Sequence, residues 1–113
     1  MKNTTLKIAT LATALFVAAL ASVSAADAKE NWEKNCAKCH GADGKGDTKM
    51  GKKVGVKDYT DPKVQAEMKD DTMFKAVKEG IKDGDKTKMK PAENLSDDEI
   101  KALVAYVRAF GKK

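Results

Sequence analysis

The chain has 113 residues, which suits one small domain, and its formal net charge at pH 7 is +5. Positive and negative side chains are interleaved, with no all-basic block of about five or six residues, and aromatic residues make up only 5% of the chain. This composition argues against a nucleic-acid-binding tail or a base-stacking surface, so nucleic acid is not an expected partner.

The N-terminus has the three-part layout of a secretory signal peptide. A basic start is followed by an apolar run over 8–20 and then by the small residues ASVSAADA. The alternative is an uncleaved membrane anchor, but the run is shorter than the roughly 18 residues that a spanning helix needs. We expect a cleaved Sec signal peptide over 1–26 and a mature domain over 27–113. Three alanines fit the cleavage site: Ala25, Ala26 and Ala28.

The expected mature domain is small and highly charged. Residues 1–26 contain two of the 22 Lys and Arg and none of the 17 acids, so the remaining 87 residues keep a net charge of about +3. A domain of this length is near the lower limit for a self-sufficient hydrophobic core, and its large apolar side chains are few. Its two cysteines allow one disulfide at most. We therefore expect a bound group, in addition to side chains, to fill part of the core.

The first helix of the mature domain is expected over 28–38. Ala28, Trp32 and Cys36 recur there every four residues, with Lys and Glu between them. Residues 41–59 hold five glycines and five lysines and show little periodicity, which predicts a long loop. Loops this long in a compact small domain usually have a function or a ligand to wrap.

Two short helices are expected in the middle of the domain. The segment 60–70 contains Asp61, a favourable N-cap, followed by Pro62, which suits the first helical position. A second helix is predicted over 70–81, ended by Gly80 or Gly84, and residues 82–95 are again expected to be irregular. The apolar face of the second helix is expected to consist of four residues: Met73, Phe74, Val77 and Ile81.

The last helix has the clearest pattern. Ser96 and Glu99 form a capping box, in which each side chain can satisfy the backbone amide of the other residue. The apolar residues that follow share one helical face: Ile100, Leu103, Val104, Val107 and Phe110. No stretch of the chain alternates as a strand would. The expected fold is therefore all-α, with about four short helices joined by two long loops.

Both cysteines and the only histidine of the chain lie within five residues, as Cys36, Cys39 and His40. Two thiols three residues apart, followed directly by a histidine, form the signature of covalent c-type haem attachment. The spacing has a geometric reason, because each thiol adds to one vinyl group on neighbouring edges of the porphyrin. The next residue is then held under the iron, where an imidazole nitrogen can serve as the proximal ligand. We therefore expect one covalent haem c, with its iron, at these three residues.

Three other interpretations of the motif are weaker. A thioredoxin-like redox pair needs a βαβ context with a preceding strand, which the sequence does not predict, and it has no need of the histidine. A structural zinc site needs four ligands, and only carboxylates remain beyond these three residues. A plain disulfide or two buried thiols would be tolerated in a secreted protein but would leave the thin core unexplained.

A second axial ligand is expected opposite His40. The chain has no other histidine, and haems of electron carriers commonly have Met/His ligation. Met68 and Met73 fall in helical patterns, where filling the core is the simpler role. Met50 is only ten residues past the histidine and would have to double back within a short loop. Met89 lies in the second irregular segment, which can cross the opposite haem face, and is the expected ligand.

The chain resembles the class I c-type cytochromes, small soluble monohaem electron carriers. The stretches that carry the resemblance are CAKCHGADGKGD, KMKP and LSDDEIKALVAYVRAF, so it covers essentially residues 28–110. It implies a cytochrome c-like fold in which the first and last helices cross, with Trp32 and Tyr106 as aromatic residues of those helices. It also implies four haem-holding positions: Cys36 and Cys39 as thioethers, His40 and Met89 as axial ligands.

The sequence departs from that family in two places. Many members have Gly-Pro in the loop after the motif, where a backbone carbonyl accepts the other N–H of the histidine. Here no proline follows His40 until Pro62, so we expect the acceptor to be another carbonyl near 51–54. A lysine also stands between Met89 and Pro91, where Met-Pro is common.

With both axial positions filled, no site remains for a small-molecule substrate. We therefore expect an electron carrier rather than an enzyme, monomeric and exported, in a bacterial periplasm in preference to a thylakoid lumen. Its expected partners are membrane-bound or periplasmic redox proteins. The alternative is a haem enzyme or sensor, such as a peroxidase or gas binder, whose Met89 is easily displaced. A peroxidase would also want an acid–base group over the open haem face, and no second histidine is present.

The lysines of the two loops are candidates for docking a partner. They would flank the haem and attract an acidic face, with a transfer rate that falls as salt is added. The simpler interpretation, solvated loop charge, is equally good, since aspartates lie among them. The residues are Lys49, Lys52, Lys53, Lys86, Lys88 and Lys90.

Overall fold

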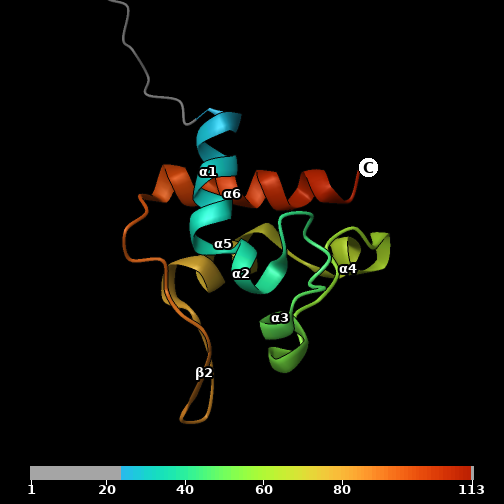
Figure 1. Cartoon of the computed structure of the whole chain (residues 1–113). Helices are drawn as coiled ribbons and strands as arrows, with labels where there is room; N and C mark the ends of the chain where they lie inside the picture. The colour runs from blue at the N-terminus through green and yellow to red at the C-terminus, as the bar shows by residue number, and fades with distance from the viewer. Residues whose placement is uncertain (1–23, 113) are drawn as a thin grey trace, which may run out of the picture.

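The computed structural model describes residues 24–112 of the chain, and this part contains six helices and one two-stranded hairpin (Figure 1). The helices are α1 Ala25–Asn35, α2 Ala37–His40, α3 Lys49–Val54, α4 Pro62–Glu67, α5 Asp70–Glu79 and α6 Asp97–Phe110, and the strands are β1 Ile81–Asp83 and β2 Lys86–Met89. None of the helices among residues 24–112 is long and apolar enough to cross a bilayer. Most of the predicted signal peptide lies outside the described residues.

The crossing of α1 and α6 forms the centre of the core (Figure 1). Trp32 of α1 is 2% exposed and belongs to one cluster with Leu103 and Phe110 of α6. Ala28, one turn before the tryptophan, is also buried. A small side chain at that position lets two helices approach closely. The prediction of an all-α fold with crossing first and last helices is confirmed.

The N-terminus of α6 is capped as predicted. Ser96 and Glu99 exchange the two hydrogen bonds of a capping box. The Glu99 carboxylate also accepts a hydrogen bond of 3.1 Å from the Asn31 side chain of α1. One side chain therefore caps α6 and ties it to the first helix.

The prediction of one unbroken helix over 28–38 is wrong at a single residue. Cys36 has φ −123° and ψ −35°, outside the helical region, so α1 ends at Asn35 and the one-turn helix α2 begins at Ala37. The indole N–H of Trp32 donates to the carbonyl oxygen of Gly41 at 2.9 Å, which ties the end of α2 back to α1. The four-residue spacing gave no sign of this break.

The predicted loop over 41–59 contains a helix that sequence reasoning missed. The Thr48 side chain caps α3, and Gly55 in the left-handed region ends it. Apart from Met50 and Val54, α3 consists of lysines and glycine, so it has no apolar face that a periodicity search could find. The short helix α3 therefore lies in a segment whose composition is typical of a loop.

The two middle helices follow their capping signals. Asp61 caps α4, and Pro62 is its first residue, both as predicted. The next helix, α5, ends at Glu79 with Gly80 as its C-cap, one of the two predicted stops. Ile81 therefore begins β1 and is 43% exposed, which corrects its assignment to the apolar face of α5. Residues 81–89 form an antiparallel hairpin where an irregular segment was expected. All of its residues before the last are exposed, so no alternation of polar and apolar side chains marked it as a strand.

Candidate functional site

The break between α1 and α2 places the three residues of the motif on one short turn. Cys36 stands between the two helices and is buried, Cys39 is half-buried within α2, and His40 is its last residue and is 8% exposed. Both cysteines are free thiols. The structure thus brings two unpaired sulfurs and a buried imidazole together, as haem attachment requires. In a disulfide the two sulfurs would be bonded to each other.

Aromatic rings surround the imidazole of His40. The ring of Tyr59 is stacked on it, with centroids 5.1 Å apart and planes 20° apart, and the indole of Trp32 lies 5.5 Å from it. Its Nδ1 atom is buried and has no hydrogen-bond partner. The prediction that a carbonyl near 51–54 accepts the N–H of this ring is therefore wrong. Among the described residues, the rings of Tyr59 and Trp32 therefore hold this imidazole in place of a hydrogen bond from Nδ1.

Burial also sets the charge of the motif. It lowers the pKa of His40 below its ordinary value, which keeps the imidazole neutral, the form that binds a metal. Burial, with a smaller contribution from the neighbouring Cys39, raises the pKa of Cys36 to about 11. Both groups are uncharged at pH 7, so the site holds no buried charge that would oppose an apolar macrocycle.

Thr48 and Gly51 hold the motif from the loop side. The Thr48 hydroxyl donates to the carbonyl oxygen of Cys39 at 2.6 Å and accepts from the Gly51 amide at 2.8 Å. A Cβ atom at Gly51 would collide with that same carbonyl oxygen and with the carbonyl oxygen of Gly46. The sequence analysis missed both residues, although a threonine before a short Lys- and Gly-rich stretch is a recognisable N-cap signal.

Met89 is the last residue of β2 and is half-buried. Its backbone is fixed from the side of α5, because Gly80, at φ +76°, packs directly against the carbonyl oxygen of Met89 and the ring of Pro91. The amide of Ala92 donates to the carbonyl oxygen of Val77 at 2.8 Å, which anchors the next turn of the chain. The role of Met89 as distal ligand remains a prediction, and these contacts give its backbone a defined position.

The other methionines in residues 24–112 have different surroundings. Met50, in α3, is 39% exposed. Met68 and Met73 are partly buried and pack against the core cluster, in keeping with a core-filling role. Met89, half-buried at the open end of the hairpin, is therefore distinguished from one surface methionine and two that contact the core.

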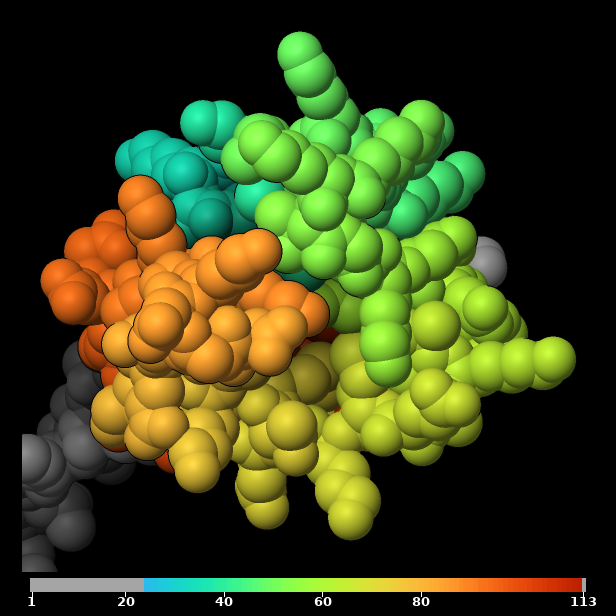
Figure 2. All heavy atoms as spheres, turned by 90° about the horizontal axis from the view of Figure 1, so that it is seen from below, coloured from blue at the N-terminus to red at the C-terminus, as the bar shows by residue number. Residues whose placement is uncertain are grey.

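A hollow opens on the face that is turned toward the viewer in Figure 2. Around it lie the segment that contains α3, drawn in green, the hairpin, in orange, and the α4–α5 region, in yellow. The six predicted docking lysines are all exposed. Three belong to α3 and two to β2, and Lys90 directly follows β2. Two of them form exposed ion pairs with neighbouring acids: Lys52 with Asp47 and Lys88 with Asp83.

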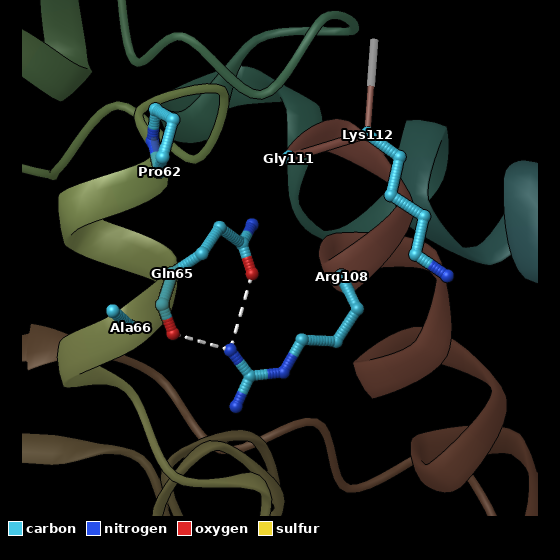
Figure 3. Close-up of a pocket in the computed structure, with 6 residues that line it drawn as sticks. All are labelled: Pro62, Gln65, Ala66, Arg108, Gly111 and Lys112. Atoms are coloured by element: carbon cyan, nitrogen blue, oxygen red, sulfur yellow. Dashed lines mark hydrogen bonds between the residues drawn. The ribbon is translucent and has the colours of Figure 1, made fainter.

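A separate groove lies between α4 and the end of α6 (Figure 3). It is lined by Pro62, Gln65, Ala66, Arg108, Gly111 and Lys112. None of the predicted site residues lines it. Nor do residues 24–112 contain a group of three or more His, Cys, Asp and Glu side chains placed to hold a metal ion, as the structural zinc alternative would need.

The chain resembles known proteins in sequence and in fold. The sequence model of the family described as "Cytochrome C oxidase, cbb3-type, subunit III" matches residues 23–107. A solved structure described as "KustC0563 c-type cytochrome" is 32% identical, with a TM-score of 0.65 over 74% of this chain and 95% of that one. A mutant of that protein is 33% identical, with a TM-score of 0.65 over 74% of this chain and 98% of that one. No curated protein matches the chain. The chain therefore belongs to this family of small c-type cytochromes, which hold haem c covalently and transfer electrons through its iron.

Proposed function

We propose that this cytochrome is a periplasmic electron carrier whose haem is bonded to Cys36 and Cys39 and whose iron is ligated by His40 and Met89. The observation that carries the ligand assignment is the buried imidazole of His40 directly beside two free thiols. Met89 is supported by elimination among the methionines and by the turn that fixes its backbone.

When bound, the haem supplies a one-electron Fe(III)/Fe(II) couple, and methionine ligation raises its reduction potential. The chain supplies a site that changes little between the two states. Trp32 and Tyr59 restrict the ring of His40, and the core behind them is formed by the crossing of α1 and α6. A rigid, mostly dry shell keeps the reorganisation that accompanies electron transfer small, which suits a carrier.

Redox proteins with acidic docking faces are the proposed partners. The segments that contain α3 and β2 border the hollow in Figure 2, and the exposed lysines that belong to these two elements supply the complementary charge. The matching family is named after an oxidase subunit, so a terminal oxidase is the first acceptor to test. Electron transfer to such a partner should slow as ionic strength rises, and a rate independent of salt would contradict docking through these lysines.

Export by a cleaved signal peptide is part of the same proposal. Ala28 is 3% exposed within α1, so a cut after it would remove a side chain from the core. We therefore favour cleavage after Ala25 or Ala26, at the exposed start of α1. The mass of the mature protein recovered from the periplasm measures the position, and a chain that begins at residue 29 would contradict it.

The decisive experiment is a pair of matched variants of the holoprotein, Met89→Ala and Met50→Ala. Haem absorbance that survives denaturation establishes the covalent attachment. The weak Met–Fe(III) charge-transfer band should disappear in Met89→Ala and persist in Met50→Ala, since Met50 lies exposed on α3. The opposite result would transfer the ligand assignment to Met50. A wild-type protein with haem but without the band would favour the open-site alternative of an enzyme or sensor.

A further inference from the structure

Among the rings described around the His40 imidazole, that of Tyr59 has the shortest centroid distance and the smallest interplanar angle. The two rings are nearly parallel, with an interplanar angle of 20° and a centroid separation of 5.1 Å. Trp32 is 5.5 Å away and tilted by 39°. A rotation of the imidazole about its bond to Cβ would therefore drive its edge into the ring of Tyr59.

Hydrogen bonds on both sides of its peptide hold Tyr59 in place. Its amide donates to the carbonyl oxygen of Gly44 at 2.9 Å. Its own carbonyl oxygen accepts from the side-chain amide of Gln65 at 2.7 Å, and the same nitrogen of Gln65 donates to the carbonyl oxygen of Val107 at 2.9 Å. Gln65 therefore connects the backbone of Tyr59 to α6.

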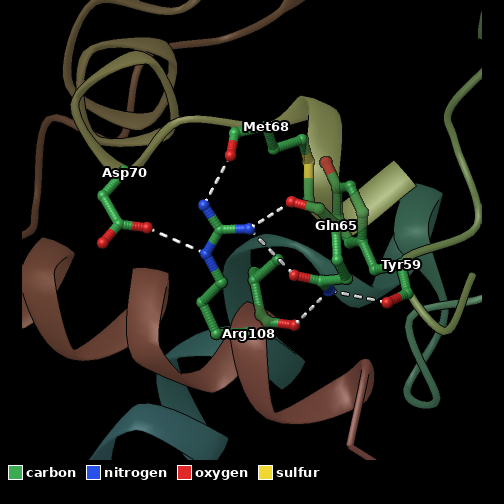
Figure 4. A network of polar contacts seen from close by, with 6 residues as sticks. Tyr59, Gln65, Met68, Asp70 and Arg108 are labelled. Atoms are coloured by element: carbon green, nitrogen blue, oxygen red, sulfur yellow. Dashed lines mark hydrogen bonds and ion pairs between the residues drawn. The ribbon is translucent and has the colours of Figure 1, made fainter. Parts of the chain in front are cut away.

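Arg108 in turn fixes Gln65 (Figure 4). One guanidinium nitrogen donates to the backbone carbonyl of Gln65 at 2.6 Å and to its side-chain oxygen at 3.1 Å. The second donates to the carbonyl oxygen of Met68 at 2.6 Å, and Nε donates to the Asp70 carboxylate at 2.8 Å. The guanidinium thus has a partner for each nitrogen, and it orients the amide that holds Tyr59.

We propose that Tyr59 is a positioning residue: its ring sets the plane of the His40 imidazole, the axial ligand. Gln65 and Arg108 keep Tyr59 in position. The inference rests on the proposed function, in which His40 is an axial ligand. The orientation of an axial imidazole affects the electronic structure of the ferric haem, and groups around a metal ligand commonly fix its orientation. In this protein packing replaces the hydrogen bond to Nδ1, which the described residues do not provide.

The shape of the tyrosine suits this role, because its flat ring lies nearly parallel to the imidazole. A phenylalanine should serve nearly as well, whereas a flexible aliphatic side chain should not.

The test uses ferric holoprotein and compares Tyr59→Phe, Tyr59→Leu and Gln65→Met. The spread and order of the haem-methyl proton NMR shifts report the orientation of the axial ligands, and the reduction potential is measured on the same samples. Tyr59→Phe should keep the wild-type pattern. Tyr59→Leu should reorder the shifts and move the potential. Gln65→Met keeps the length of the side chain but loses the amide donor, so it should change the pattern in the same direction by less.

Asp70→Asn is the matched control, because it weakens the far end of the Arg108 network without touching Gln65 or Tyr59. It should lower stability slightly and leave the shift pattern unchanged, which separates positioning from mere stabilisation. Identical patterns in Tyr59→Leu and wild type, with an intact low-spin spectrum, would overturn the inference alone. A wild-type spectrum without low-spin haem would instead overturn the ligation by Met89, so failure of the proposed function and failure of the inference give different results.

Discussion

The two proposed ligands of the iron are held in opposite ways. His40 is 8% exposed and lies among aromatic rings at the end of α2, behind which Trp32 is 2% exposed. Met89 ends a hairpin whose other residues are all exposed, and its backbone is fixed by glycine and proline contacts instead of by a packed core. One side of the site is held by buried side chains and the other by backbone shape.

This difference suits a small cytochrome with a thin core. The buried apolar side chains are concentrated at the crossing of α1 and α6, which supports the histidine. Met89 is carried instead by a short antiparallel hairpin that extends from the body of the protein (Figure 1). Perturbations of the first region should therefore reduce the stability of the whole domain, whereas perturbations of the second should mainly affect the methionine ligand.

Removing Trp32 should have the largest effect. Trp32→Ala deletes the side chain that contacts both His40 and Phe110, at an expected cost of about 3–5 kcal/mol in the free energy of unfolding. Trp32→Phe keeps most of the bulk but leaves the carbonyl oxygen of Gly41 without its indole donor, at about 1–3 kcal/mol. Denaturant unfolding of the holoproteins measures both. A loss below about 1 kcal/mol in Trp32→Ala would show that this side is not held by its packing.

The hairpin offers a matched pair of glycines for the second region. Gly80 and Gly84 both have positive φ, so alanine strains the backbone at either position, by roughly 1–3 kcal/mol. A Cβ at Gly84 meets open space, whereas one at Gly80 collides with the carbonyl oxygen of Met89 and with Pro91. Gly80→Ala should cost about 1–3 kcal/mol more.

Gly80→Ala should also weaken the Met–Fe(III) charge-transfer band, because the collision moves the backbone of Met89. Gly84→Ala should leave the band intact and is the control. The absorbance of the ferric proteins at neutral pH measures the difference. Equal bands in the two variants would mean that the turn at Gly80 does not position the methionine.

The same contrast explains what the sequence could predict. The spacing of Cys36, Cys39 and His40 and the capping box of α6 are local signals, which can be recognised without knowing the fold. The hairpin lies wholly at the surface, so no face of it had to be apolar, and the glycine that ends α5 moved Ile81 out of the predicted helix. The break at Cys36 is accompanied by a hydrogen bond from the Trp32 indole to the carbonyl oxygen of Gly41, a contact that the spacing of residues does not display.

Contacts between distant residues account for the rest of what was missed. Tyr59 contacts His40 from nineteen residues along the chain, and Gln65 is 43 positions from Arg108. Neither pair has a spacing or composition that a single sequence displays. They depend on how the helices pack, and the resemblance to a family supplied the crossing of the first and last helices but not these partners.

The smallest expected effect concerns pH and the helix crossing. Hydrogen bonds from the Ser96 amide, from the Asn31 side chain and from the Ser96 hydroxyl hold the pKa of Glu99 below its usual value of 4.5. A carboxyl group whose folded pKa is depressed adds stability above its unfolded pKa, and this stability is lost as pH falls through the folded pKa. Glu99→Gln should therefore be less stable than wild type at pH 7, and the difference should shrink as pH falls from about 5 to about 3. Asp98→Asn removes a charge from the same turn of α6 and is the control. Since Glu99 ties α1 to α6 on the histidine side, the Met–Fe(III) band should be unchanged in Glu99→Gln, and a weakened band would show that the two sides of the site are coupled.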